Sequence, residues 1–398
     1  MKKDAGENRK MEDANRSPED IKTGSSDVKA APRCSYFGRC GGCSAQHIAY
    51  GTQAENKRNM LARAAGLDSK DVLLFTGSPY NYRNRMDFIF HSRGLGLREK
   101  GKWHRIIDIK RCEIAGENIN SLLKEVREWF SGADHFDMVR KEGTFRYAVI
   151  REGSRGSSVS FMLNDDSQGK EDALKKIRDF AAKTQADNVV AAYVHKDTDV
   201  SVSDNYQVIK GSDMLRADYL GRSFLYPVQG FFQNNHEMAE KLQEYCHRLL
   251  KGYDTSGARL LDLYSGVGTF GIMNADLFSR VTMVESVESC IKAAERNMKE
   301  NSISNAECIT LDAKRLKRLD LPHPLFVITD PPRSGMNPKT IEHLMSIKPE
   351  VMIYVSCNIS QLGKDLKKFR DYSIKSAALF DMFPQTPHCE AVAELVRV

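Results

Sequence analysis

The sequence lacks the signals of membrane and secreted proteins. Its 398 residues contain no run of 18 apolar residues, and no apolar stretch follows the basic residues of the N-terminus MKKDAGENRK, so we expect neither a membrane span nor a signal peptide. The nine cysteines are odd in number and spread along the chain, unlike the dense, even set of a small disulfide-bonded domain. These absences predict a cytoplasmic protein without a membrane partner.

A strong charge of one sign is also absent. The chain carries 59 Lys and Arg against 53 Asp and Glu, a net charge of +6, which permits an anionic partner without requiring one. Residues 1–33 contain eight basic and seven acidic side chains and no aromatic ring, so they have too little apolar surface to offset the entropy of ordering. We interpret them as a disordered polar tail.

The rest of the chain divides into two regions. At about 100 to 200 residues per domain, its length predicts two or three folded units. Residues 34–225 begin with a Gly- and Cys-rich knot and a helix candidate at 51–66, and short alternating segments at 159–163, 189–194 and 199–203 then predict a β-rich central domain. Within this region, residues 45–78 could instead pack on the C-terminal domain.

Residues 226–398 alternate helices with short apolar strands. A helix begins near residue 236, where Met238, Leu242 and Tyr245 recur at helical spacing. Strand candidates follow at 259–263, 281–285, 307–311, 325–329, 351–355, 374–380 and 391–397. This α/β alternation predicts a mainly parallel sheet covered by helices on both faces, which binds ligands at the carboxyl ends of its strands.

Glycines and carboxylates follow the first three of these strands. The first strand contains Asp262 and runs into the glycine-rich turn 264–271, the second ends at Glu285, and the third ends at Asp312. Glycines let the backbone approach a ligand at the start of a helix, and a carboxylate after the second strand lies where a ribose diol binds. The pattern favours a nucleoside such as S-adenosylmethionine, and an NAD dehydrogenase is the competing interpretation.

The fourth and fifth strands carry the reactive side chains. The fourth ends in Asp330-Pro331-Pro332-Arg333, a rigid turn that fixes a carboxylate beside the cofactor pocket, although amino-group methyltransferases also use an Asp-Pro-Pro turn. The fifth ends in Ser356-Cys357-Asn358, which brings a thiol to the ligand-binding edge of the sheet. The alternative is that Cys357 is a small core side chain.

Several motifs, in one order, resemble a known family. They are Ser-Gly-x-Gly-x-Phe, Asp-Pro-Pro-Arg, Val-Ser-Cys-Asn, the upstream Phe231-Phe232-Gln233-Asn234 and the terminal His388-Cys389-Glu390-Ala391-Val392. Together they are similar to the RNA uracil-5-methyltransferases that use S-adenosylmethionine, over residues 34–398. The resemblance implies a Rossmann-like class I methyltransferase domain joined to a β-rich RNA-binding domain that carries a cysteine cluster.

The resemblance also implies roles for individual residues. A thiolate must add to C6 of uracil before C5 can attack a methyl group, and a base must then remove the C5 proton. The family pattern gives Cys357 as the nucleophile, Glu390 as the base, Asp330 as the carboxylate that orients uracil, and Phe231 as a ring that stacks on a base of the RNA. The predicted cofactor contacts are Gln233, Asp262, Tyr264, Ser265, Gly266, Gly268, Glu285, Asp312 and Asp330.

Two positions depart from the family pattern. Ile359 stands where members commonly have proline, and Cys389 stands where they commonly have a β-branched residue. Neither position carries a reacting group, so the departures affect the shape of the pocket more than the class of reaction.

Four cysteines form a separate candidate site. Cys34, Cys40, Cys43 and Cys112 resemble the [4Fe-4S] ligands of the cluster-bearing branch of the family, and zinc is the less favoured occupant of such a thiolate set. The spacing Cys-x5-Cys-x2-Cys differs from the Cys-x3-Cys-x2-Cys of radical S-adenosylmethionine enzymes. We therefore expect a structural or RNA-positioning cluster.

A basic stretch is the candidate RNA-binding surface. Residues 83–111 contain nine basic and three acidic side chains with aromatic residues between them, which is typical of single-stranded RNA binding. We predict phosphate contacts by Arg98, Lys100 and Lys102, and the family pattern implies that Arg85 lies near the target base. A solvated charged face is the alternative interpretation.

The leading prediction is a monomeric enzyme that methylates C5 of one uridine in RNA. The cysteine set favours 23S ribosomal RNA over transfer RNA, because the bacterial transfer-RNA branch of the family generally lacks these cysteines. Two alternatives remain: an amino-group methyltransferase that uses the Asp-Pro-Pro turn, and a non-catalytic iron–sulfur RNA-binding protein.

Overall fold

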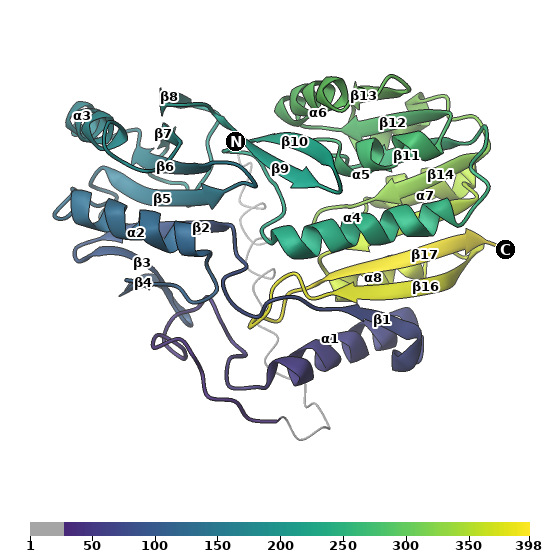
Figure 1. Cartoon of the computed structure of the whole chain (residues 1–398), viewed down its shortest axis with the longest axis horizontal. Helices are drawn as coiled ribbons and strands as arrows, with labels where there is room; N and C mark the ends of the chain where they lie inside the picture. Colours follow the sequence, from purple (N-terminus) through teal and green to yellow (C-terminus); the bar gives the residue numbers. More distant parts are fainter. Residues whose placement is uncertain (1–27) are drawn as a thin grey trace, which may run out of the picture.

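The computed structural model describes residues 28–398. Two β-sheets, each with helices packed on it, lie side by side, and a small hairpin lies beside the larger sheet (Figure 1). The hairpin consists of β9 (Met214–Tyr219) and β10 (Arg222–Pro227). The predicted α/β class and the predicted β-rich central region are both confirmed.

The larger sheet has eight strands in the order β1-β16-β17-β15-β14-β11-β12-β13. Its strands are β1 (Val72–Phe75), β11 (Arg259–Leu263), β12 (Arg280–Glu285), β13 (Ala306–Thr310), β14 (Leu325–Thr329), β15 (Val351–Ser356), β16 (Tyr372–Phe380) and β17 (Glu390–Arg397). All pairs are parallel except those of β17, which runs antiparallel to both β15 and β16. Each of the seven strands predicted in residues 226–398 is confirmed to within two residues at either end.

Helices cover both faces of this sheet. One face packs against α4 (His236–Lys251), α5 (Thr269–Met273), α6 (Glu288–Glu300) and the β9–β10 hairpin. The other packs against α1 (Tyr50–Ala65), α7 (Pro338–Ile347), α8 (Ile359–Leu366) and the 3₁₀ helix η4 (Ala313–Arg318). Two shorter 3₁₀ helices are η2 (Ser69–Asp71) and η3 (Ala275–Leu277).

The segment that precedes the central domain belongs structurally to the larger sheet. Strand β1 pairs in parallel with β16 at the edge of the sheet, and Leu61 of α1 is buried in the core on that face. Helix α1 lies so close to α8 that a Cβ at Gly363 would come within 2.8 Å of the Ala64 carbonyl oxygen. Glycine at this position therefore allows the two helices to touch.

The smaller sheet has seven strands in the order β4-β3-β2-β5-β6-β7-β8. They are β2 (Arg85–His91), β3 (Gly94–Glu99), β4 (Lys102–Asp108), β5 (Phe145–Glu152), β6 (Ser157–Asn164), β7 (Asn188–Val194) and β8 (Tyr206–Lys210). Helices α2 (Glu117–Trp129) and α3 (Lys170–Ala181) share the hydrophobic core of this sheet. The predicted strands at 159–163 and 189–194 correspond to β6 and β7.

The strand predicted at 199–203 is wrong, because polar side chains hold this segment as an irregular connection. Asp199 accepts hydrogen bonds from Arg98 and the Tyr147 hydroxyl, and Ser201 Oγ donates to Asp87 at 2.5 Å. The polar residues of this alternating segment bond to side chains of the central domain, and the segment forms no strand.

The predicted polar tail falls mostly on residues 1–27, which lie outside the described residues. Its last part, residues 28–33, is ordered, which corrects the prediction for those positions. The Ala49 amide donates to the Val28 carbonyl at 2.7 Å, the Ala30 amide donates to the His47 carbonyl at 2.9 Å, and Arg33 pairs with Glu113 at 2.9 Å. Backbone pairing and one ion pair therefore replace the apolar surface that this segment lacks.

No helix within residues 28–398 is long and apolar enough to cross a membrane.

Candidate active site at the carboxyl edge of the larger sheet

Strand register brings Asp330, Cys357 and Glu390 to the same edge of the sheet. Strand β14 pairs with β15 up to Thr329 and Tyr354, and β15 pairs with β17 up to Ser356 and Ala391. Asp330 directly follows β14, Cys357 directly follows β15, and Glu390 is the first residue of β17. Since β17 is antiparallel, its first residue lies where β15 ends, which closes a gap of 33 residues in the sequence.

Burial and mutual repulsion raise the pKa values of Asp330, Cys357 and Glu390. Glu390 is 4% exposed, and burial followed by the charge of Asp330 holds its pKa well above the usual range. Burial raises the pKa of Asp330 to about 7. For the half-buried Cys357, burial and then the charges of Glu390 and Asp330 raise the thiol pKa to about 11. At neutral pH the resting site therefore holds a thiol, not a thiolate.

Arg333 acts on the same residues, a role that no sequence motif assigned to it. It lowers the pKa of Cys357 and of Glu390, against the larger effect of burial. The Asn358 side chain donates to the Arg333 carbonyl at 2.9 Å and accepts from the Gln361 amide at 3.2 Å, which caps α8. One asparagine thus joins the Asp-Pro-Pro-Arg turn to the helix that follows Cys357. The arginine of the Asp-Pro-Pro-Arg motif is the feature of the sequence that could have indicated this role.

A buried lysine binds the loop that leads into Glu390, residues 381–389. Lys57 of α1 is 4% exposed, and its ammonium group donates to Asp381 Oδ1 at 2.6 Å, to the Phe383 carbonyl at 3.2 Å and to the His388 carbonyl at 3.0 Å. No local sequence pattern indicates this contact, because Lys57 and Asp381 are 324 residues apart.

The same loop also contacts the cysteine-rich segment and the central domain. The Gln385 carbonyl accepts from the amides of Ser44 and Ala45 at 2.9 and 3.1 Å, immediately after Cys43. Gln53 donates to the Gln385 side chain at 3.0 Å and accepts from the Gln385 amide at 3.1 Å. The Tyr82 hydroxyl donates to the Pro384 carbonyl at 2.9 Å. Loop 381–389 therefore connects the edge carrying Glu390 to three other parts of the molecule.

The glycine-rich turn after β11 has an open side and a closed side. Tyr264, Gly266 and Gly268 have φ values of 64°, 53° and 84°, a left-handed conformation that favours glycine. A Cβ at Gly266 would meet no atom within 4 Å, whereas one at Gly268 would lie 2.9 Å from Met283 Sδ. The turn thus packs on β12 through Gly268 and leaves space for a ligand at Gly266.

The carboxylates around this turn lie where the sequence predicts them. Asp262 accepts from the Gly271 amide at 2.7 Å, burial raises its pKa to about 7, and its other oxygen has no hydrogen-bond partner within residues 28–398. The same is true of the buried Ser265 hydroxyl. Glu285 accepts from the Gly266 amide at 3.2 Å, and Asp312 pairs with Lys314 at 2.7 Å. These unpartnered polar atoms and the open glycine fit a polar nucleoside ligand.

Phe231 is exposed in the turn that follows β10. It is 72% exposed, while its neighbour Phe232 is buried and stacks on Tyr226 with ring centroids 4.0 Å apart. The buried Arg151 of β5 donates to the Val228 and Gly230 carbonyls at 2.8 and 2.7 Å. Close by, the Gln233 carbonyl accepts from the Asn84 side chain at 3.2 Å.

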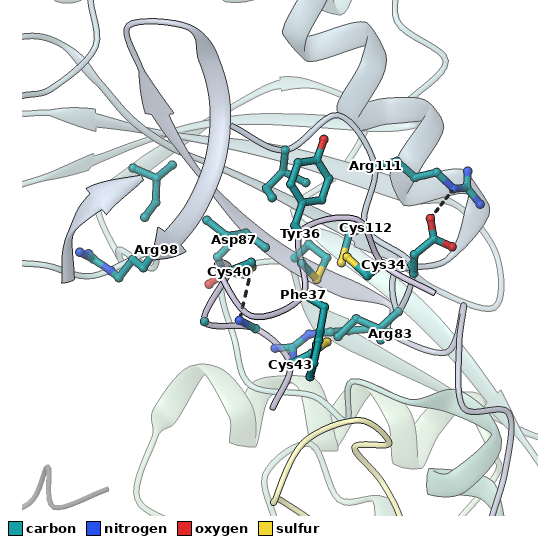
Figure 2. Close-up of a pocket in the computed structure, with 18 of the residues that line it drawn as sticks. Cys34, Tyr36, Phe37, Cys40, Cys43, Arg83, Asp87, Arg98, Arg111 and Cys112 are labelled. Atoms are coloured by element: carbon teal, nitrogen blue, oxygen red, sulfur yellow. Dashed lines mark hydrogen bonds and ion pairs between the residues drawn. The ribbon is translucent and has the colours of Figure 1, made fainter. Parts of the chain in front are cut away.

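The four predicted cluster cysteines open onto one cavity of about 380 Å³. Figure 2 shows Cys34, Cys40, Cys43 and Cys112 around this cavity, with Arg83 beside Cys43. The backbone of Cys112 is fixed by Asn120, which accepts from its amide at 2.8 Å. Within residues 28–398, however, no group of three or more His, Cys, Asp or Glu side chains is arranged to hold a metal ion. The thiols share a cavity without converging.

Most of the predicted RNA-binding cations are already paired. Arg85 forms a two-pronged hydrogen bond with Asp87 at 2.9 and 3.1 Å. Arg98 pairs with Asp199 at 2.7 Å, and Lys102 pairs with Glu99 at 3.0 Å.

Two cations nearby differ from these. Lys100 is exposed and makes no ion pair among the described residues. Arg83 lies over the ring of Phe383, 5.9 Å from its centroid, so it contacts loop 381–389 where Arg85 does not.

Strand order and site together define a class I, S-adenosylmethionine-dependent methyltransferase fold, with β17 inserted antiparallel between β15 and β16. Residues 49–398 match the family model described as tRNA (uracil-5-)-methyltransferase. The chain therefore belongs to this family, and it is an enzyme that methylates C5 of uracil in RNA.

Relatives and a solved structure agree with this assignment. The tRNA (uracil(54)-C(5))-methyltransferase of Pyrococcus horikoshii is 34% identical over 94% of this chain and 87% of its own length. An uncharacterized RNA methyltransferase of Clostridium tetani is 32% identical over 93% of this chain and 84% of its own length. The crystal structure of the Pyrococcus abyssi tRNA (uracil-54, C5)-methyltransferase with S-adenosyl-L-homocysteine superimposes with a TM-score of 0.74, at 30% identity, over 89% of this chain and 86% of that one.

Proposed function

We propose that Cys357 adds to C6 of the target uracil and that Glu390 later removes the proton from C5. The observation that carries this proposal is the strand register, which brings Asp330 after β14, Cys357 after β15 and Glu390 at the start of β17 to one edge of the sheet. Addition forms the S–C6 bond and moves an electron pair toward C5. C5 then takes a methyl group, Glu390 accepts the C5 proton, and the thiolate leaves as the C5–C6 double bond returns.

This order of events requires Cys357 and Glu390 to ionise against the effect of burial, because the thiolate adds to C6 and a carboxylate accepts the C5 proton. The Cys357 thiol must lose its proton before it can add, and its pKa of about 11 opposes this. Arg333 acts in the opposite direction and favours the thiolate. Asp330, whose pKa burial raises to about 7, can accept a proton near neutral pH. It can also accept from the imide edge of uracil, so we propose that Asp330 orients the base.

We propose that S-adenosylmethionine, which supplies the methyl group, binds over the glycine turn. The residues that would hold it are those at the carboxyl ends of β11, β12 and β13: Asp262, Tyr264, Ser265, Gly266, Gly268, Glu285 and Asp312, with Gln233 and Asp330 beside them. The support is the open side of Gly266 and the unpartnered oxygens of Asp262 and Ser265.

The experiment for the mechanism uses Glu390→Gln. Without the base, addition and methylation can proceed while elimination stalls, so a methylated covalent enzyme–RNA adduct should accumulate on denaturing gels and in mass spectra. The matched control is Glu394→Gln on the same strand, which should accumulate no adduct. Loss of activity without any adduct in Glu390→Gln would remove Glu390 from this role.

We propose transfer RNA as the substrate, at the position that corresponds to uracil 54. The relatives from Pyrococcus horikoshii and Pyrococcus abyssi are named for this reaction, and we therefore favour transfer RNA over the 23S ribosomal RNA that the cysteines suggested. Mapping 5-methyluridine in both RNAs of the source organism, with and without the gene, tests the choice. Loss of the mark from 23S ribosomal RNA alone would restore the earlier prediction.

We propose that Cys34, Cys40, Cys43 and Cys112 hold a [4Fe-4S] cluster with a structural role. The shared cavity and the soft thiolate set support it, and binding would require the four thiols to converge. The cluster would join the segment before α1 to the segment before α2. Anaerobic purification with metal analysis should give about four irons per chain. One zinc in colourless protein would make it a structural zinc site, and no metal would refute the proposal.

We also propose that Phe231 and Lys100 contact RNA, since both are exposed. Arg85, Arg98 and Lys102 would have to give up the ion pairs described above. The predicted cytoplasmic location and monomeric state stay predictions.

A further inference from the structure

A basic hollow on the catalytic domain has no part in the function proposed so far. Helices η4 and α7 line a cavity of about 360 Å³. Five cations face it, Lys314, Arg315, Lys317, Arg318 and Lys339, and Glu342 is the one carboxylate in its lining. The hollow thus collects a local excess of positive charge that the near-neutral composition of the chain does not indicate.

The geometry of η4 produces this surface. A 3₁₀ helix has three residues per turn, so side chains three apart lie in one row. Ala313 and Leu316 form the row that is buried in the core. The remaining positions form two outward rows, Lys314 with Lys317 and Arg315 with Arg318, and all four residues are exposed. Because Ala313 and Leu316 are buried, the four cations of η4 are left on its exposed side.

Four of these cations make no ion pair with the part of the chain that the structure describes. Lys314 pairs with Asp312. Among the ion pairs and side-chain hydrogen bonds of residues 28–398, none involves Arg315, Lys317, Arg318 or Lys339. The basic stretch 83–111 differs, because Arg85, Arg98 and Lys102 are each bound to a carboxylate. Like charges held close together repel each other, and a bound polyanion would relieve that repulsion.

The hollow adjoins the edge of the sheet that carries the candidate active site. Helix η4 starts directly after Asp312, at the carboxyl end of β13, and Lys339 lies in the first turn of α7, shortly after the Asp330–Arg333 turn. An RNA that delivers a uridine to Cys357 must cover this edge. We propose that the hollow binds backbone phosphates of the substrate RNA outside the target nucleotide. This inference rests on the proposed function.

The test is the salt dependence of RNA binding by the full chain. Lys317→Ala/Arg318→Ala should flatten the log–log slope of affinity for a full-length tRNA transcript against KCl by about 1.4 to 1.8, if each side chain meets one phosphate. The matched control, Lys175→Ala/Arg178→Ala, removes one exposed lysine and one exposed arginine from α3 and should keep the wild-type slope. An unchanged slope in the first variant, or an equal change in the control, would overturn the proposal.

A second RNA locates the contact. A short hairpin that carries only the target loop should lose less affinity in Lys317→Ala/Arg318→Ala than the full-length transcript, because the phosphates of the hollow lie outside that loop. An equal loss for both RNAs would contradict this position. Methylation by the wild-type enzyme is measured in parallel. If it methylates neither RNA, the proposed function fails, and the comparison of slopes still decides whether the hollow binds RNA.

Discussion

Replacing Lys57 by methionine should destabilise the protein and loosen the loop that carries Glu390. Lys57 and Asp381 are 6% and 0% exposed in their side chains, with 2.6 Å between Nζ and Oδ1. Removal of one partner of a buried ion pair leaves the other charge without compensation and costs about 3–5 kcal/mol. Methionine keeps the length of the aliphatic chain, so the loss reflects the ammonium group and its three hydrogen bonds.

Urea unfolding at pH 7 measures this cost against a control. Lys292→Met breaks an exposed pair with Glu288 on α6, whose side chains are 66% and 71% exposed, and should cost at most about 0.5 kcal/mol. Lys57→Met/Asp381→Asn should lose less stability than the sum of its two single variants, because the second change removes the stranded charge. A loss in Lys57→Met no larger than in Lys292→Met would refute the reasoning.

The catalytic effect of Lys57→Met is measured on folded enzyme. Since Lys57 fixes the carbonyls of Phe383 and His388, its removal should displace Glu390 and slow elimination more than addition. A methylated adduct should therefore build up, as in Glu390→Gln. Lys57→Arg, which keeps the charge, should recover part of the turnover. A variant that loses stability but turns over at the wild-type rate would show that the lysine only supports the fold.

Three further predictions concern individual side chains. Arg333→Ala should raise the pKa of Cys357 above about 11, so iodoacetamide should label this thiol more slowly at pH 8, and faster labelling would contradict the assigned effect. Asp262, whose pKa is raised to about 7 in the fold, ionises first in the unfolded chain, so its contribution to stability should fall by about 3 kcal/mol between pH 4 and pH 7. Asp262→Asn should flatten that part of the urea-unfolding profile, and an unchanged profile would contradict the burial argument. Phe231→Ala should weaken RNA binding by about 1–3 kcal/mol, whereas Phe231→Tyr should bind RNA as tightly as the wild type. Equal RNA affinities of the two variants would exclude stacking.

The strands of the larger sheet could be predicted because of how they are buried. Strands such as Leu325–Thr329 are buried along their whole length, so they appear as short apolar runs bounded by turn residues. Strand β1 escaped prediction because it has four residues and Leu73 within it is 48% exposed. Its place in the sheet depends on pairing with β16, more than 300 residues later in the sequence.

The reacting residues could be predicted from motifs, but their support could not. Cys357 and Asp330 end adjacent strands, and Glu390 follows from the resemblance. The contact of Lys57 with Asp381 and the pairing of Arg98 with Asp199 join residues 324 and 101 positions apart. A charge count over residues 83–111 therefore overestimates the free positive charge, because the neutralising carboxylate of Asp199 lies outside that window.

Trapping with 5-fluorouridine tests the central claim most directly. Fluorine at C5 prevents removal of a proton, so an RNA with 5-fluorouridine at the target position should remain attached to the enzyme after methylation. With wild-type protein and S-adenosylmethionine, mass spectrometry should find one methylated nucleotide on the peptide that contains Cys357. Cys357→Ala should form no adduct, and Cys389→Ala, which removes the other thiol nearby, should still form it. An adduct in Cys357→Ala, or methylation of normal RNA by wild-type protein that never forms the trapped species, would contradict Cys357 as the nucleophile.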